Sequence, residues 1–192
     1  MDSYFLRPSH SPYFAPVAPF WNRWSPEKRI VAVASGVFLL DQLTKLLVVL
    51  LLPEDGHRDV IRGFFRWVHW ANTGAAWSQF HGYNGVLAMV AVGALVAFWR
   101  WRHQFESGRL GGQIALGCLM GGIVGNLLDR VLRGHVVDFL RFYWSTRSGD
   151  EIGFPAFNVA DMGITTSVTL LILLAWQAPD RTAKTAGPSS PS

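Results

Sequence analysis

Four long apolar stretches constrain the fold of this chain more than any other feature. They cover residues 30–52, 86–101, 110–132 and 157–176 of a 192-residue sequence. An α-helix needs about 20 residues to cross the roughly 30 Å of hydrocarbon in a bilayer. Only 16% of the residues are charged, against about 25% in a typical soluble domain, so too little polar sequence remains to cover four buried helices. The pattern predicts an all-α membrane protein with four transmembrane helices.

The charged residues between these stretches predict the topology. The N-terminal segment, the loop after the second stretch and the C-terminal tail together carry nine Lys and Arg and four Asp and Glu, whereas the other two loops carry seven of each. Loops rich in Lys and Arg stay in the cytoplasm, so we expect both termini there. The net charge of +4 is spread along the chain and does not indicate a nucleic-acid partner.

The remaining sequence divides into a membrane domain and two tails. We expect a disordered cytoplasmic extension over residues 1–25, a four-span domain over 26–178 and a disordered tail over 179–192. Between the first two spans, "DVIRGFFRWVHWANTGAAWSQF" is rich in β-branched and aromatic residues. It predicts a small extracytoplasmic sheet at the membrane surface, with Trp67, Trp70 and Trp77 at the interface. We expect residues 46–52 to leave the first helix and join this sheet, and residues 133–157 to form an extended re-entry.

A stripe of small residues marks the third span. Gly117, Gly121 and Gly125 recur every four residues, which predicts a flat helix face where another helix packs closely. The single cysteine, Cys118, excludes an internal disulfide and is expected to be a free thiol. We expect a monomer.

Several polar residues lie where hydrocarbon or its outer edge is expected. Asp41 and Lys45 are four residues apart in the first span, a spacing that allows an ion pair. In "ANTGAAWS", the small residues from Gly74 to Ala76 leave room for a backbone or ligand near Asn72. The third span ends in "GNLLDR": Asn126 and Arg130 lie one turn apart, and Asp129 is most simply the structural partner of an arginine.

Two carboxylates are the strongest candidates for chemistry. Asp138, in "GHVVDFL", has apolar neighbours. Asp161 heads the fourth span three residues after Asn158, a spacing that predicts both side chains on one helix face. Both fall near the outer ends of adjacent spans. Two carboxylates in a partly dry site do not both ionise at low cost, so one is expected to retain a proton. Such a pair supplies the base that activates water and the acid that protonates a leaving group.

Other functions fit some of these residues. A proton-coupled small-molecule carrier also buries Asp and Lys, although its polar groups span the full membrane depth. A non-catalytic assembly subunit uses the glycine stripe and tolerates replacement of the aspartates. The histidines show no HExxH or paired spacing, so we expect neither a metal nor another cofactor.

Taken in order, the motifs "DQLTK", "NTGAAWS", "GGIVGNLLDR", "GHVVDF" and "FNVADMGI" resemble the lipoprotein signal peptidase (signal peptidase II) family over about residues 30–176. The resemblance implies an aspartyl endopeptidase of the bacterial cytoplasmic membrane with its active site near the outer face. Its implied substrates are prolipoproteins, cleaved just before a diacylglyceryl-modified cysteine, and lipophilic cyclic peptides of the globomycin type are implied inhibitors. It implies that Asp138 and Asp161 are catalytic and that the substrate-binding or supporting residues are Asp41, Lys45, Asn72, Gly74, Asn126, Arg130 and Asn158.

Overall fold

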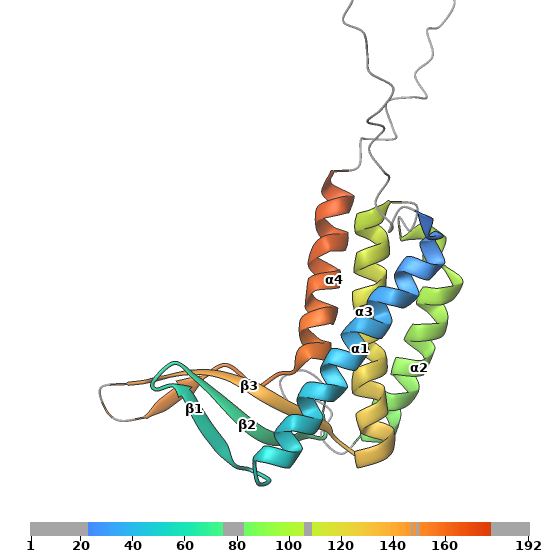
Figure 1. The fold of residues 1–192 in the computed structure, drawn as a ribbon. Coiled ribbons are helices and arrows are strands. Elements are labelled where there is room, and N and C mark those ends of the chain that lie inside the picture. Colours follow the sequence, from blue (N-terminus) through green and yellow to red (C-terminus); the bar gives the residue numbers. More distant parts are fainter. Residues whose placement is uncertain (1–22, 75–82, 106–108, 147, 149, 178–192) are drawn as a thin grey trace, which may run out of the picture.

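The computed structural model describes residues 23–74, 83–105, 109–146, 148 and 150–177. Within these ranges the chain forms a bundle of four α-helices with an antiparallel sheet at one end (Figure 1). Residues 1–22, the C-terminal tail and the sequence from Ala75 to Trp77 lie outside the described residues.

The helices are α1 (Pro26–Leu51), α2 (Asn84–Arg100), α3 (Leu110–Arg133) and α4 (Val159–Trp176), with a short 3-10 helix, η3 (Arg102–Gln104), after α2. Ser25 caps the start of α1, where Pro26 occupies the first turn. In length and composition α1, α3 and α4 are able to cross a membrane, whereas α2, with 17 residues, is a shorter apolar helix. The described residues therefore contain three candidate spans, not the four expected.

One expectation about α1 was wrong. Residues 46–52 were expected to join the sheet, but α1 continues through Leu51. This Leu- and Val-rich run keeps its backbone hydrogen bonds within the helix, while Leu47, Leu50 and Leu51 remain more than half exposed on the outside of the bundle. A helix satisfies its own backbone in an apolar environment, whereas a lone strand does not.

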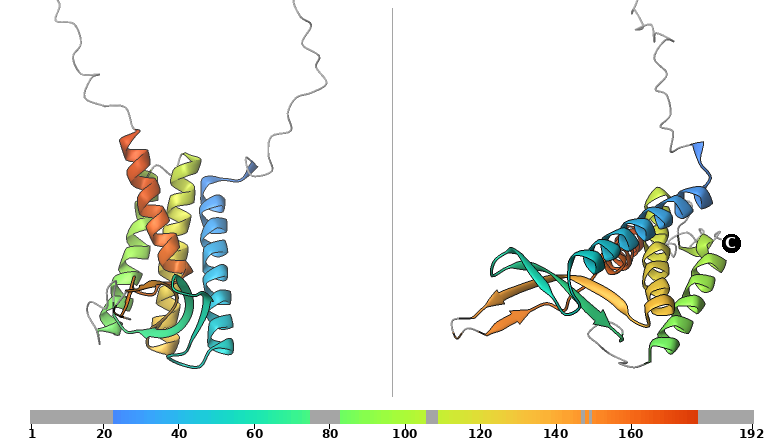
Figure 2. Two further views of the ribbon diagram at one scale, coloured as in Figure 1. Left: turned by 90° about the vertical axis from the view of Figure 1, so that its left-hand side faces the viewer. Right: turned by 60° about the horizontal axis from the view of Figure 1, so that its bottom comes forward.

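The glycine stripe places α3 at the centre of the bundle, between α1 and α4 (Figure 2). A Cβ atom on Gly121 would lie 2.5 Å from the Ala34 carbonyl oxygen of α1, and one on Gly122 would lie 2.4 Å from the Ala160 carbonyl oxygen of α4. The predicted close helix packing is thus confirmed, and it occurs on two faces of α3.

The sheet takes strands from both connections on its side of the bundle. Its order is β1 (His57–Ile61), β2 (Phe65–Asn72), β3 (Val136–Ser145) and β4 (Glu151–Gly153), all antiparallel. The expected sheet used only the first connection, but the stretch expected as an extended re-entry supplies β3 and β4. The pairing of β2 with β3 places Trp70 opposite Asp138 and Asn72 opposite Val136.

The two faces of β3 differ because successive side chains alternate. Val137 and Phe139 pack with Val48 of α1 in a buried cluster, whereas Asp138 occupies the alternate face. Farther along the sheet, the Phe142 ring contacts the rings of Phe64, Phe65 and Phe157. The sheet is thereby anchored to the end of α1 and to the residues that precede α4.

Candidate active site

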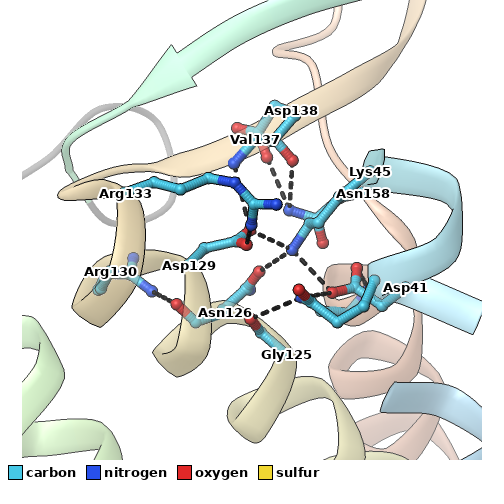
Figure 3. Close-up of polar contacts among 12 residues, drawn as sticks. Asp41, Lys45, Gly125, Asn126, Asp129, Arg130, Arg133, Val137, Asp138 and Asn158 are labelled. Carbon is cyan, nitrogen blue, oxygen red and sulfur yellow. Dashed lines mark hydrogen bonds and ion pairs between the residues drawn. The ribbon is translucent and has the colours of Figure 1, made fainter. Parts of the chain in front are cut away.

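All ten site residues selected from the sequence, nine of them polar, meet at the sheet end of the bundle. One hydrogen-bonded network, much of which is visible in Figure 3, joins residues of α1, β2, the turn after β2, α3, β3 and α4. Its members are Asp41, Lys45, Asn72, Gly74, Asn126, Asp129, Arg130, Asp138, Asn158 and Asp161.

Asp138 is held by two carboxamides. Asn72 Nδ2 donates to Asp138 Oδ2 at 2.9 Å, and Asn158 Nδ2 donates to Oδ1 at 2.7 Å. The residue is 4% exposed. Burial, followed by the charge of Asp161, raises the pKa of Asp138; hydrogen bonds from Asn72 and Asn158 and the charge of Lys45 oppose the rise, and the resulting pKa is about 7. Asp138 therefore keeps its proton to a higher pH than an exposed aspartate does.

Asp161 lies in the first turn of α4, where a capping box fixes it. Asn158 Oδ1 accepts from the Asp161 backbone N–H at 2.9 Å, and Asp161 Oδ2 accepts from the Asn158 backbone N–H at 3.3 Å. Asn126 Nδ2 donates to the other carboxylate oxygen at 2.8 Å. Asn158 is the N-cap and not a helical residue, so capping, not a shared helix face, explains why it lies next to Asp161. Its side chain bonds to both Asp138 and the Asp161 backbone.

The buried ammonium group of Lys45 joins side chains of α1 and α3 (Figure 3). Lys45 Nζ is 2.8 Å from Asp41 Oδ2, 2.7 Å from Asp129 Oδ2 and 3.0 Å from Asn126 Oδ1, so all three of its donors are used. The Lys45, Asp41 and Asp129 side chains are fully buried. The ion pair that the spacing of Asp41 and Lys45 allows is present. Because the ammonium takes the Asn126 oxygen, the Asn126 amino group faces Asp161.

The two carboxylates that flank Lys45 also hold the backbone beside each aspartate of the pair. Asp41 Oδ1 accepts from the Ala160 N–H at 2.8 Å, one residue before Asp161. Asp129 Oδ2 accepts from the Val137 N–H at 3.3 Å, one residue before Asp138. The arginine that pairs with Asp129 is Arg133, one turn later on α3. The buried cluster of Lys45, Asp41 and Asp129 therefore connects α1 and α3, through hydrogen bonds, to the chain segments that carry Asp138 and Asp161.

Arg130 binds protein carbonyl groups. Its Nη2 donates to Gly74 O at 3.0 Å and its Nη1 donates to Asn126 O at 3.3 Å. Gly74 in turn donates its N–H to Asn72 Oδ1 at 2.9 Å. Gly74 thus contributes two backbone groups to the network.

Sequence reasoning missed two side chains of this region. Gln42 donates to Asp41 Oδ2 and to the Gly125 carbonyl, and Asn84 donates to the Arg130 carbonyl. Each is a polar residue within or at the head of an apolar stretch, which is a signal that the sequence carries. Among the described residues, no group of three or more His, Cys, Asp or Glu side chains is arranged to hold a metal ion.

Comparison with known proteins connects this geometry to a family. Residues 33–177 match the family model described as signal peptidase (SPase) II. The chain is 38% identical over 143 residues to the lipoprotein signal peptidase of Symbiobacterium thermophilum, covering 74% of this chain and 91% of that protein. It is 33% identical over 152 residues to the lipoprotein signal peptidase of Listeria monocytogenes, covering 79% and 95%.

Solved structures show the same fold. A bacterial membrane enzyme determined by the in meso method at 2.3 Å resolution superposes with a TM-score of 0.68 at 27% identity, covering 86% of this chain and 95% of that one. A second, determined at 1.9 Å, has a TM-score of 0.66 at 30% identity, covering 78% and 94%. The family match spans α4 completely, most of α1, and all of α2, α3 and the sheet between them. The chain belongs to the signal peptidase II family.

Proposed function

We propose that this protein is a lipoprotein signal peptidase that removes the signal peptide of prolipoproteins by cutting just before the diacylglyceryl-modified cysteine. Family membership and the names of its relatives support the reaction. The observation that carries the mechanism is the arrangement of Asp138 and Asp161, which bond to the same asparagine at the sheet end of the bundle.

In the proposed mechanism Asp138 and Asp161 share one proton. The ionised carboxylate takes a proton from water as the water oxygen bonds to the scissile carbonyl carbon. The protonated carboxyl gives its proton to the amide nitrogen as the carbon–nitrogen bond breaks, so the products are a free carboxyl and a free amine and the pair again holds one proton. The pKa of about 7 for Asp138 supports this role, since the carboxyl changes its protonation state readily near neutral pH.

The supporting residues act on the pair from the protein side. Asn72, Asn126 and Asn158 donate to the two carboxyl groups and set their orientation. Asp41 and Lys45 hold Asn126 and the first turn of α4. In this proposal Asn72 and Arg130 also lie beside the bound peptide, whose acyl chains remain in the bilayer.

The course of the helices supports four membrane crossings. α1 and α3 both end near the sheet, and α4 returns from it, so the chain between α1 and α3 has to run back along the bundle (Figure 1). α2 makes this return; at about 1.5 Å per residue it is slightly shorter than about 30 Å of hydrocarbon. The loop charges support a topology with both termini in the cytoplasm and the two aspartates near the outer face of the bacterial cytoplasmic membrane.

The sheet in this proposal rests on the outer membrane surface. Phe64, Trp144, Ile152 and Phe154 are about half exposed on it, and aromatic side chains favour the interface between lipid and water. Affinity for the substrate then comes largely from its acyl chains, at about 0.8 kcal/mol per buried methylene. In this proposal the protein is a monomer, and cyclic peptides of the globomycin type inhibit it.

A cleavage assay tests the proposed function. The purified protein should cut a diacylglyceryl-cysteine precursor and spare the same peptide without lipid. Asp138→Asn and Asp161→Asn should each abolish cleavage, because asparagine keeps the size of the side chain and loses the ionisable group. Both variants should still show a cooperative thermal unfolding transition, which indicates an intact fold. Equal cutting of lipidated and bare peptide would overturn the substrate assignment. Solute-driven proton uptake by proteoliposomes, without cleavage, would instead support the carrier.

A further inference from the structure

The last turn of α3 is capped by a residue from another helix. Asn84 Nδ2 donates to the Arg130 carbonyl oxygen at 3.0 Å. That carbonyl lies in the last turn of α3, which ends at Arg133. Asn84 is the first residue of α2, and the N-cap position of α2, Tyr83, makes no side-chain capping bond. Asn84 therefore satisfies α3 and not its own helix.

Arg130 links Asn84 to the turn after β2. Its guanidinium donates to Gly74 O at 3.0 Å, so a single residue contacts Gly74 through its side chain and Asn84 through its backbone. The same guanidinium donates to Asn126 O within α3, which limits its movement. Arg130 thus connects Asn84 to the Gly74 carbonyl.

Gly74 determines which way the Asn72 carboxamide faces. The Gly74 N–H donates to Asn72 Oδ1 at 2.9 Å, closing a turn of the type that asparagine side chains form with the backbone two residues on. A carboxamide has one oxygen and one amino group, so engagement of the oxygen directs the amino group away from Gly74. That amino group donates to Asp138 Oδ2 at 2.9 Å.

We propose that Asn84 is a positioning residue for Asp138. By holding the Arg130 carbonyl, it keeps the guanidinium on Gly74 and so keeps the Asn72 amino group on the Asp138 carboxylate. Neither the family motifs nor the composition of α2 indicates this role. The effect on cleavage rests on the proposed function, but the effect on Asp138 itself does not.

The sign of the expected change follows from the groups around Asp138. Asn72 of β2, Asn158 of α4 and the charge of Lys45 on α1 favour the carboxylate, and the charge of Asp161 on α4 opposes it. On α3, Arg130 attracts the Asp138 charge; Asp129, also on α3, pairs with Lys45 and Arg133. Loss of Asn84 weakens the Asn72 bond and leaves the other groups in place, so Asp138 should be harder to ionise.

The test compares Asn84→Ala with Asn84→Gln, which keeps a donor, and with Val86→Ala as a matched α2 control on an exposed side chain. The pH midpoint of the Asp138 carboxyl is followed by infrared spectroscopy in detergent, with the band assigned by its loss in Asp138→Asn. We expect Asn84→Ala to raise the midpoint by up to about one pH unit, Asn84→Gln to raise it less, and Val86→Ala to leave it unchanged. This titration needs no cleavage, so it remains informative if the protein cuts no prolipoprotein.

Kinetics provide the second measurement. Asn84→Ala should lower kcat about 2- to 10-fold, the range for loss of one hydrogen bond, while KM for the lipidated precursor changes less than about 2-fold. In an Asn72→Ala background the same substitution should have no further effect on the midpoint or kcat. Independent effects in the double variant, or an unchanged midpoint, would overturn the proposal. Asn84→Ser, whose side chain is shorter, replaces Asn84→Ala if the latter is not recovered folded.

Discussion

Replacing Lys45 by methionine should damage this protein more severely than any other single change to a lysine. Methionine keeps the length of the side chain and removes the ammonium group. Asp41 and Asp129 would then be fully buried without their shared cation. Each keeps some donors, since Asp41 retains Gln42 and the Ala160 N–H and Asp129 retains Arg133 and the Val137 N–H.

The magnitude follows from this burial. Removing one member of a buried ion pair destabilises a protein by about 3–5 kcal/mol, because the remaining charge has lost its compensation. In a chain of this length each kcal/mol corresponds to about 2–4 °C in Tm, so Lys45→Met should lower Tm by roughly 6–20 °C. The substitution also frees Asn126 Oδ1, so the amide is able to rotate and withdraw its donor from Asp161.

Thermal unfolding in detergent and cleavage of a lipidated precursor measure the two consequences. Lys28→Met is the matched control, since Lys28 also lies on α1 and is exposed; its Tm should stay within about 2 °C of the wild type. Adding Asp41→Asn to Lys45→Met removes the carboxylate that loses its ion pair, whereas Asp129 still pairs with Arg133, and should recover part of the stability. Cleavage should stay low because Asn126 is still unrestrained. A Tm for Lys45→Met equal to that of the control would refute this account of the buried cluster.

Two further predictions concern Asp138 and the packing of α3. The pKa of Asp138 is raised from 3.8 to about 7, so the folded protein binds the proton of this carboxyl more tightly than the unfolded chain does. The stability that the protonated carboxyl contributes is therefore full below about pH 3.8 and is lost as the pH rises through about 7. Asp138→Asn should remove this part of the pH dependence of Tm, and a wild-type-like profile in the variant would contradict it. Gly122→Ala would bring a Cβ to 2.4 Å from the Ala160 carbonyl oxygen and should destabilise the protein by about 1–3 kcal/mol in thermal unfolding. Gly93→Ala is the control, because a Cβ there has nothing within 4 Å, and it should not destabilise the protein. Equal Tm values for the two variants would contradict the close packing of α3 against α4.

Local sequence patterns were sufficient for features that depend on neighbours along the chain. The long apolar runs predict helices because only a helix satisfies its own backbone in lipid. The glycine spacing predicts the close packing of α3, and the four-residue spacing of Asp41 and Lys45 allows the ion pair that is observed. The nearness of Asn158 and Asp161 was also expected, although the structure attributes it to a helix cap.

Contacts between distant segments were decided by the tertiary structure. The residues from 133 to 157 are extended in the prediction, but only their pairing with β2 brings Asn72 to Asp138, 66 residues away. Residues 46–52 were expected to join the sheet, but α1 continues through Leu51 and meets the sheet only at its end. Such pairings depend on which surfaces meet in three dimensions, and propensity does not encode that.

The sequence by itself determined which polar residues are costly to bury, and therefore which ones are candidates for a functional role. It did not determine their partners: Lys45 reaches Asn126 and Asp129 more than 80 residues away, and Asn84 caps a helix other than its own. A buried charge or a terminal carbonyl has to find a partner, but the packing of α1, α2 and the sheet on α3 selects which one.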